Sequence, residues 1–265
     1  MMNYWTQRSI NLAMNANYLD LLFDVYPVQL SNPRRELMPH QVEEIISSYN
    51  NHDDLRLLNI LLDLEVFPIK YAYIATLRED REAITRNPEI VSRIINELYN
   101  LGIDEILNRC SAPKESNRQI SKLFKQWIGT GTLGLPVLLY PNEFLQRHDN
   151  CILNSSDKAM KQFAAEFLGF SRNKGIDFLA RVNGKYIVGE AKFLTSEGGN
   201  QNNQFYDAIS SMHSFSLSKF QVIPIAILDG VLYLHNHGKI YEYLSSNQQD
   251  NIMSALLLRE FLYSL

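Results

Sequence analysis

Three residues of the 265-residue chain, Asp177, Glu190 and Lys192, have the types and spacing that metal-assisted hydrolysis needs. Two carboxylates held close together repel each other unless a cation lies between them. Carboxylate oxygens are the ligands that Mg²⁺ prefers, and a bound Mg²⁺ keeps waters and recruits phosphate oxygens. A lysine beside it can orient or deprotonate the attacking water and offset charge in the transition state. The trio therefore predicts a Mg²⁺ site for phosphodiester hydrolysis.

The local sequence predicts a β-hairpin that positions these three residues. Segments 176–182 and 185–193 are strand-like, and Asn183-Gly184 between them is a strong signal for a two-residue turn. In that register Asp177 and Glu190 lie directly opposite each other, with Cβ atoms about 5 Å apart. Lys192 follows Glu190 by two residues and leaves the same face. A solvated hairpin with an ordinary cross-strand cluster is the alternative, although like charges directly opposite are destabilising.

Segments on either side of the hairpin predict the rest of an α/β (α+β) fold. A helix is expected at 157–168, capped by Ser155 or Ser156, and another at 201–215. The apolar run 222–228 is typical of a strand buried on both faces. Asp229-Gly230 is expected to turn the chain into short strands at 231–235 and 239–243, before a closing helix at 256–265. The order helix, hairpin, helix, strand predicts a mixed β-sheet flanked by helices.

The motif and its setting resemble the PD-(D/E)xK nuclease superfamily, and within it the type II restriction endonucleases. The resemblance rests on Ile176-Asp177, twelve intervening residues and then Glu190-Ala191-Lys192, and it covers about residues 157–228. Ile176 stands where the superfamily usually has proline, a position that does not ligate metal. The resemblance implies a restriction-endonuclease-like core.

The same resemblance implies roles for individual residues. Asp177, Glu190 and the backbone carbonyl of Ala191 are expected to bind Mg²⁺, and Lys192 is expected to assist hydrolysis. Glu166, on the helix before the hairpin, is a candidate additional metal ligand. An exposed helix glutamate with no role in catalysis is the alternative for Glu166.

Positive charge is concentrated around the predicted site. Residues 111–192 hold 12 Lys/Arg and 7 Asp/Glu, whereas the rest of the chain holds 13 and 22. Local positive charge suits phosphate binding, and amide side chains can read base edges. We therefore predict DNA contacts from a basic helix near residue 118 and from the amide-rich run after Lys192: Lys114, Asn117, Arg118, Lys122, Asn200, Gln201, Asn203 and Gln204. A solvated helix face and a flexible loop are the alternatives.

Composition and patterning predict two parts to the chain. Residues 1–110 show helical apolar spacing and are expected to form a helical region that contacts DNA or dimerises, whereas residues 111–265 form the catalytic domain. No apolar run approaches the roughly 18 residues that would span a bilayer. The two cysteines do not form a disulfide framework and do not have the spacing of zinc ligands. The sequence contains no Gly-rich phosphate-binding loop, so no nucleotide cofactor is expected. A cytoplasmic protein is expected.

These inferences together predict a site-specific endonuclease for double-stranded DNA that leaves 5′-phosphate ends. A homodimer is expected, because one site per chain then cuts each strand of a two-fold symmetric sequence. A structure- or damage-specific repair or junction nuclease on the same core is the nearest alternative. A non-catalytic nucleic-acid-binding protein with a nuclease-like fold is the third.

Overall fold

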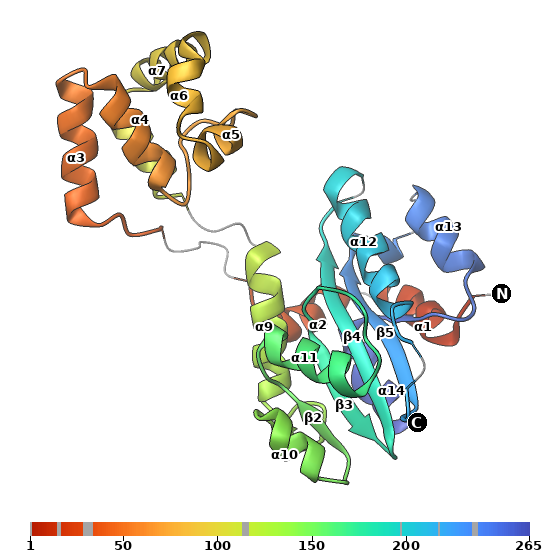
Figure 1. Cartoon of the computed structure of the whole chain (residues 1–265). Helices are drawn as coiled ribbons and strands as arrows, with labels where there is room; N and C mark the ends of the chain where they lie inside the picture. Colours follow the sequence, from red (N-terminus) through yellow and green to blue (C-terminus); the bar gives the residue numbers. More distant parts are fainter. Residues whose placement is uncertain are drawn as a thin grey trace. The chain divides into compact units, whose positions relative to one another are not determined.

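A computed structural model describes residues 2–14, 17–28, 34–112, 117–196, 198–216, 218–234 and 238–265, apart from the side chains of residues 117–119 and 200. The chain forms two compact units (Figure 1): Met1–Val28 with Ser116–Leu265, and Gln29–Glu115. The expected single boundary between residues 110 and 111 differs from this division. The first 28 residues join the C-terminal part because Tyr18, Leu22 and Val25 bury their side chains in its core.

A mixed six-stranded sheet forms the centre of the first unit, as the sequence predicts. Its strands follow one another in space in chain order, with β2, β3 and β4 antiparallel and the β1–β2, β4–β5 and β5–β6 pairs parallel. The strands are β1 (Val137–Leu138), β2 (Cys151–Leu153), β3 (Phe178–Val182), β4 (Lys185–Leu194), β5 (Val222–Gly230) and β6 (Asn251–Met253).

Helices cover both faces of this sheet. The face from which Glu190 and Lys192 emerge carries α10 (Pro141–Gln146), α11 (Asp157–Phe167), α12 (Gly199–Met212) and α13 (Gly238–Ser246). The other face carries α2 (Tyr18–Val25), α9 (Asn117–Gly129) and α14 (Leu258–Tyr263), while α1 (Tyr4–Ala13) packs beside β6. The predicted helices at 157–168 and 201–215 are present as α11 and α12, and Ser156 caps α11 by accepting from the Ala159 N–H.

The β3–β4 hairpin has the register that the Asn183-Gly184 turn predicts. Val182 pairs with Lys185 and Phe178 pairs with Gly189, so residue numbers along the ladder keep a constant sum. Asn183 and Gly184 both have positive φ, +50° and +77°, as the type I′ turn requires. The strand β3 begins at Phe178, two residues later than expected. Asp177 therefore lies just before the ladder, although its N–H still donates to the Gly189 carbonyl at 3.1 Å.

The C-terminal part of the first unit differs from the predicted pair of short strands. Asp229 and Gly230 end β5 and do not form a turn, and Val231–Tyr233 is a 3₁₀ helix (η1). The segment expected as strand 239–243 is helical because Ile240 and Leu244, four residues apart, bury one helix face. The expected closing helix at 256–265 is present as α14, which begins at Leu258 after a second 3₁₀ helix, η2 (Ala255–Leu257).

Asp229 forms a fully buried polar cluster on the sheet face opposite Glu190. Its Oδ2 accepts from the Tyr26 hydroxyl at 2.8 Å and from the Ala255 N–H at 3.2 Å, and its Oδ1 accepts from Ser254 Oγ at 2.5 Å. Burial raises the pKa of Asp229 to about 6, against the lowering effect of these hydrogen bonds. The cluster ties α2 and the start of η2 to the end of β5.

The second unit is helical, as the sequence predicts. Its core is built from apolar side chains such as Leu58, Leu98 and Ile106. The helices are α3 (Pro39–Asn50), α4 (Asp54–Asp63), α5 (Ile74–Glu79), α6 (Ala83–Arg86), α7 (Pro88–Leu101) and α8 (Ile103–Cys110). In the described part of the chain, no helix of either unit is long and apolar enough to cross a membrane.

Gly230 is a position where the sheet tolerates no side chain. Its φ is +102°, and a Cβ atom there would lie 2.0 Å from the Leu194 carbonyl oxygen across the β4–β5 pair. Replacing Gly230 with alanine is expected to lower the free energy of unfolding by about 3 kcal/mol or more, measured by urea denaturation. Gly131→Ala is the control, because Gly131 has a φ of +77° but open space around it. Equal losses for the two variants would contradict the close approach.

Candidate active site

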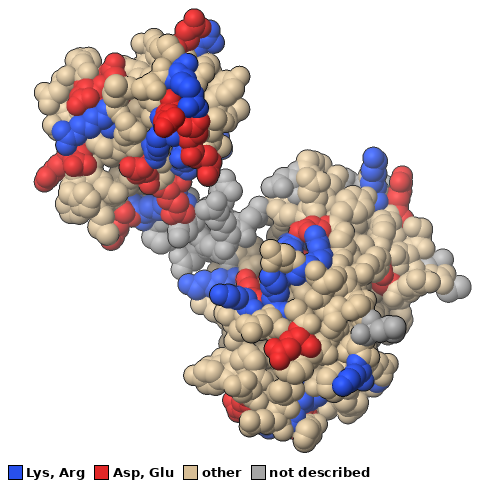
Figure 2. Space-filling model, in the orientation of Figure 1, with Lys and Arg blue, Asp and Glu red and all other residues tan. Residues whose placement is uncertain are grey.

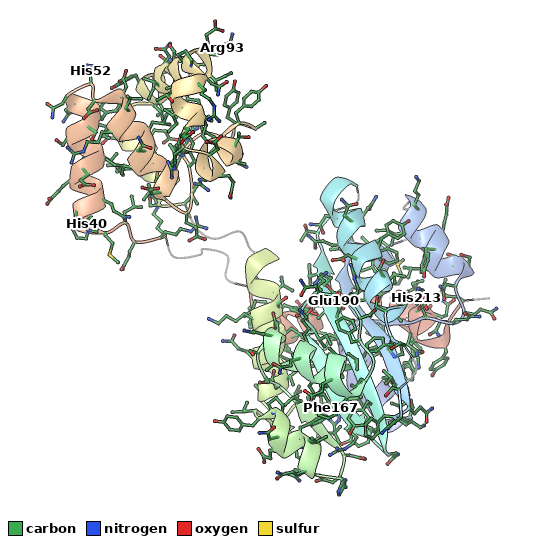
Figure 3. All side chains as sticks on the ribbon, viewed as in Figure 1. His40, His52, Arg93, Phe167, Glu190 and His213 are labelled. Carbon is green, nitrogen blue, oxygen red and sulfur yellow. The ribbon has the colours of Figure 1, made fainter. Side chains whose placement is uncertain are left out.

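The fold brings Asp177, Glu190 and Lys192 together on one face of the hairpin. Lys192 Nζ lies 2.7 Å from Glu190 Oε1 and 3.6 Å from Asp177 Oδ2. Asp177 and Glu190 are buried, with exposed fractions of 7% and 3%. Glu190, labelled in Figure 3, lies on β4 beside α12. Each carboxylate is thus shielded from water, and its negative charge must be stabilised by neighbouring groups.

The backbone of β4 holds the Asp177 side chain. Asp177 Oδ2 accepts from the Ala191 N–H at 3.0 Å. Burial raises the pKa of Asp177, and the charge of Glu190 adds to this, whereas Lys192 and the Ala191 N–H act in the opposite direction without cancelling it. In the described part of the chain, no donor bonds the other oxygen, Oδ1.

Glu190 is compensated from two sides. Two ammonium groups approach Oε1, Lys174 Nζ at 2.5 Å and Lys192 Nζ at 2.7 Å, while Ser211 Oγ donates to Oε2 at 2.7 Å. Burial acts to raise the pKa of Glu190, but Lys192, Lys174 and Ser211 outweigh it and the pKa is lowered. Burial likewise acts to lower the pKa of Lys192, but Asp177 and Glu190 outweigh it and the pKa is raised.

Four residues that the sequence did not single out complete this polar cluster. Asp207 and Ser211 lie one turn apart on α12, and Arg172 and Lys174 lie in the segment before β3. Lys174 Nζ forms an ion pair with Asp207 Oδ2, and Arg172 Nη2 lies 2.8 Å from Asp207 Oδ1. Arg172 Nη1 also donates to Ser211 Oγ at 2.9 Å. The i, i+4 spacing of Asp207 and Ser211 was the available signal, but it does not reveal which way that face of α12 points.

Oxygen donors suited to Mg²⁺ surround this position. Asp177 supplies Oδ1, and Glu190 supplies Oε1, which has no partner in hydrogen-bond geometry despite its two close ammonium neighbours. The Ala191 carbonyl lies 3.3 Å from Lys192 Nζ. No group of three or more His, Cys, Asp or Glu side chains able to hold a metal occurs among the residues described. Two carboxylates and a carbonyl, together with waters, would give a hard-oxygen set of the kind that Mg²⁺ prefers.

The structure does not bring Glu166 to this cluster. Glu166 is exposed on α11 and lines a surface pocket with Tyr140, Asn142 and Gln162. This position does not support the expected role as an additional metal ligand, because residue 166 follows the buried Phe163 and Ala164 onto the solvent side of the helix. The acidic residue of α11 that does act on Asp177 is Asp157, whose charge contributes to raising the Asp177 pKa.

The predicted DNA-contacting residues fall into four groups. Lys122 lines a surface groove with Ser121, Lys125 and Asn154. Gln201 is buried and its Oε1 accepts from the Thr195 N–H at 3.3 Å, so it supports the loop after β4 and is not available to a base edge. Asn203 is exposed and Gln204 is half-buried on α12. Lys114 and the side chains of Asn117, Arg118 and Asn200 lie outside the described residues.

On the face drawn in Figure 2, Lys and Arg side chains of the first unit gather between α9 and α12. Arginines of the second unit pair instead with nearby carboxylates, including Arg81 with Asp63 at 2.5 Å and Arg109 with Glu105 at 2.7 Å. Side chains already neutralised in this way are poorly placed to bind phosphates.

Comparison with protein families matches one family over nearly the whole chain. The family model described as Tsp45I type II restriction enzyme covers residues 3–265. The chain belongs to this family. A type II restriction enzyme is a site-specific endodeoxyribonuclease, so the restriction endonuclease inferred from the hairpin motif is confirmed at the level of the family. The match spans both units of this family member. Comparison with curated proteins and with solved structures gives no match.

The two carboxylates are expected to affect stability in opposite directions. Because the pKa of Asp177 is raised, its protonated form favours folding below the ordinary pKa of an aspartate, and this stabilisation is lost as the pH rises through the raised pKa. The lowered pKa of Glu190 means that its ionised form favours folding above its ordinary pKa, and that contribution is lost as the pH falls. At pH 7 with EDTA, Asp177→Asn should raise the free energy of unfolding, and Glu190→Gln should lower it. Urea denaturation measures both, and changes of the same sign would contradict these directions.

Proposed function

We propose that this family member is a Mg²⁺-dependent endonuclease of the PD-(D/E)xK type whose metal-binding side chains are Asp177 and Glu190 and whose catalytic lysine is Lys192. The observation that carries this proposal is their convergence: two buried carboxylates and one ammonium group meet on one face of a hairpin. The Ala191 carbonyl, between Glu190 and Lys192 in sequence, is the third protein oxygen that we assign to the metal.

The chain's own residues would perform three tasks at this site. Asp177 Oδ1, Glu190 Oε1 and the Ala191 carbonyl would hold Mg²⁺, which supplies Lewis acidity and a more acidic bound water. The Ala191 N–H and Ser211 fix the orientation of the two carboxylates. Lys192 Nζ lies 2.7 Å from Glu190 Oε1 and 3.6 Å from Asp177 Oδ2, so we assign Lys192 to orienting the water and neutralising the phosphate.

DNA would approach the first unit. Lys122 lines the groove beside α9, where Lys125 is held by Asp157, and the helix α12 carries the exposed Asn203 and the half-buried Gln204. Arg81 and Arg109 of the second unit are paired with carboxylates, so we assign this unit to contacts between protein chains. We propose a homodimer on double-stranded DNA, with each chain cutting one strand and leaving a 5′-phosphate end.

Cleavage of phage DNA by the purified protein tests the proposal. With Mg²⁺ the wild type should give discrete bands, and Lys192→Ala should lower the cleavage rate by 100-fold or more, because one preorganised charge in a catalytic site contributes about that much. Lys161→Ala is the matched control, since Lys161 is a lysine on α11 that contacts Asn173 outside the cluster. EDTA should abolish cleavage, and sequencing of the cut ends gives the recognition sequence, the overhang and the terminal phosphate.

Three results would contradict the proposal. Intact DNA under all divalent ions tested would indicate a non-catalytic nucleic-acid-binding protein. Cutting confined to branched or lesioned DNA would indicate a structure- or damage-specific nuclease. Discrete bands that persist with Lys192→Ala would show that another residue carries the reaction.

A further inference from the structure

Lys174 contributes a second ammonium group to the proposed metal site. It lies three residues before Asp177, in the segment between α11 and β3, and its side chain is 31% exposed. Its Nζ lies 2.5 Å from Glu190 Oε1, closer than the 2.7 Å of Lys192. Two positive charges therefore share one buried carboxylate oxygen.

Lys174 occupies the oxygen of Glu190 that a metal ion would need. Lys192 also contacts this oxygen but is shared with Asp177, and Ser211 donates to the other oxygen, Oε2. Because Oε2 is bonded to Ser211, Oε1 is the oxygen that remains for a metal ion. Lys174 Nζ and a divalent cation cannot both contact Oε1 from the open side without strong repulsion, which at short range exceeds the thermal energy several-fold even at an intermediate dielectric. The ammonium group and the metal therefore compete.

Asp207 gives Lys174 a second partner. The same Nζ forms an ion pair with Asp207 Oδ2, and Asp207 is fixed on α12 by Arg172, whose Nη2 lies 2.8 Å from its Oδ1. Lys174 can consequently leave Glu190 without losing every counter-charge. Its partial exposure leaves room for the side chain to move.

We propose that Lys174 is a movable counter-ion that occupies the metal-binding oxygen of Glu190 and withdraws to Asp207 when a divalent cation binds. This inference rests on the proposed function, because it takes Glu190 as a metal ligand. Lys174 acts here as a positioning residue that sets the affinity of the site for metal.

Titration of the full-length protein with Mn²⁺, followed by the electron paramagnetic resonance signal of the free ion and with no DNA present, tests the inference. Lys174→Met should bind Mn²⁺ at least tenfold more tightly than the wild type, because the competing charge is gone. Lys174→Gln is a second variant with the same expectation. Lys174→Arg, which keeps the charge, should stay within threefold of the wild type.

Arg172→Met is the matched control for general electrostatics. It removes the same charge from the same cluster, but Arg172 contacts Asp207 and Ser211 and not Oε1 of Glu190. Its Mn²⁺ affinity should change by less than threefold. Thermal unfolding of each variant checks that the fold is retained.

Unchanged affinity in both Lys174→Met and Lys174→Gln would overturn the inference, as would an equal gain in Arg172→Met. These outcomes are separate from the failure of the proposed function, which is read from DNA cleavage by the wild type. A wild type that cuts DNA, with Lys174 variants of unchanged affinity, would remove only the counter-ion role. Absence of Mn²⁺ binding in the wild type and in both Lys174 variants would overturn it together with the metal site.

Discussion

The burial of two carboxylates is the constraint on which the rest of the first unit depends. Asp177 and Glu190 leave the same face of a hairpin inside a helix-covered sheet, where an uncompensated charge is strongly unfavourable. The surrounding elements answer this constraint in different ways: β4 offers the Ala191 N–H, α12 offers Ser211, and the segment before β3 offers Lys174. This burial also leaves carboxylate oxygens whose charge a bound cation would compensate, which suits a metal-dependent nuclease of this restriction enzyme family.

The elements with local signals could be predicted from the sequence. The Asn183-Gly184 turn fixed the register because its positive φ angles suit few other residue pairs, and the apolar run of β5 identified a buried strand. Strand ends were less certain. Asp177 lies outside the ladder because its carboxylate turns to the Ala191 N–H, and this bond depends on a residue fourteen positions away.

The partners of the trio could not be predicted because they depend on how separate elements pack. Asp207 reaches the site only through the rotation of α12 about its axis, and Lys174 only through the path of an irregular segment. Glu166 shows the opposite case, since a plausible spacing on α11 placed it near the motif in sequence but on the solvent side in space. Gln201 likewise had a suitable type for base contacts but is used to support a loop.

The N-terminal helices pack against the C-terminal part of the first unit, and this affects the order in which the chain folds. Thr6 Oγ1 donates to the Ile252 carbonyl, the Ser254 N–H donates to Ser9 Oγ, and Tyr26 bonds Asp229. The helical unit, residues 29–115, is inserted between these partners and has a core of its own. During synthesis on the ribosome, the inserted unit can fold as soon as it emerges, whereas α1 and α2 must wait until their partners at residues 229–254 have been added. A truncated product would thus contain a folded helical unit beside an unfinished sheet.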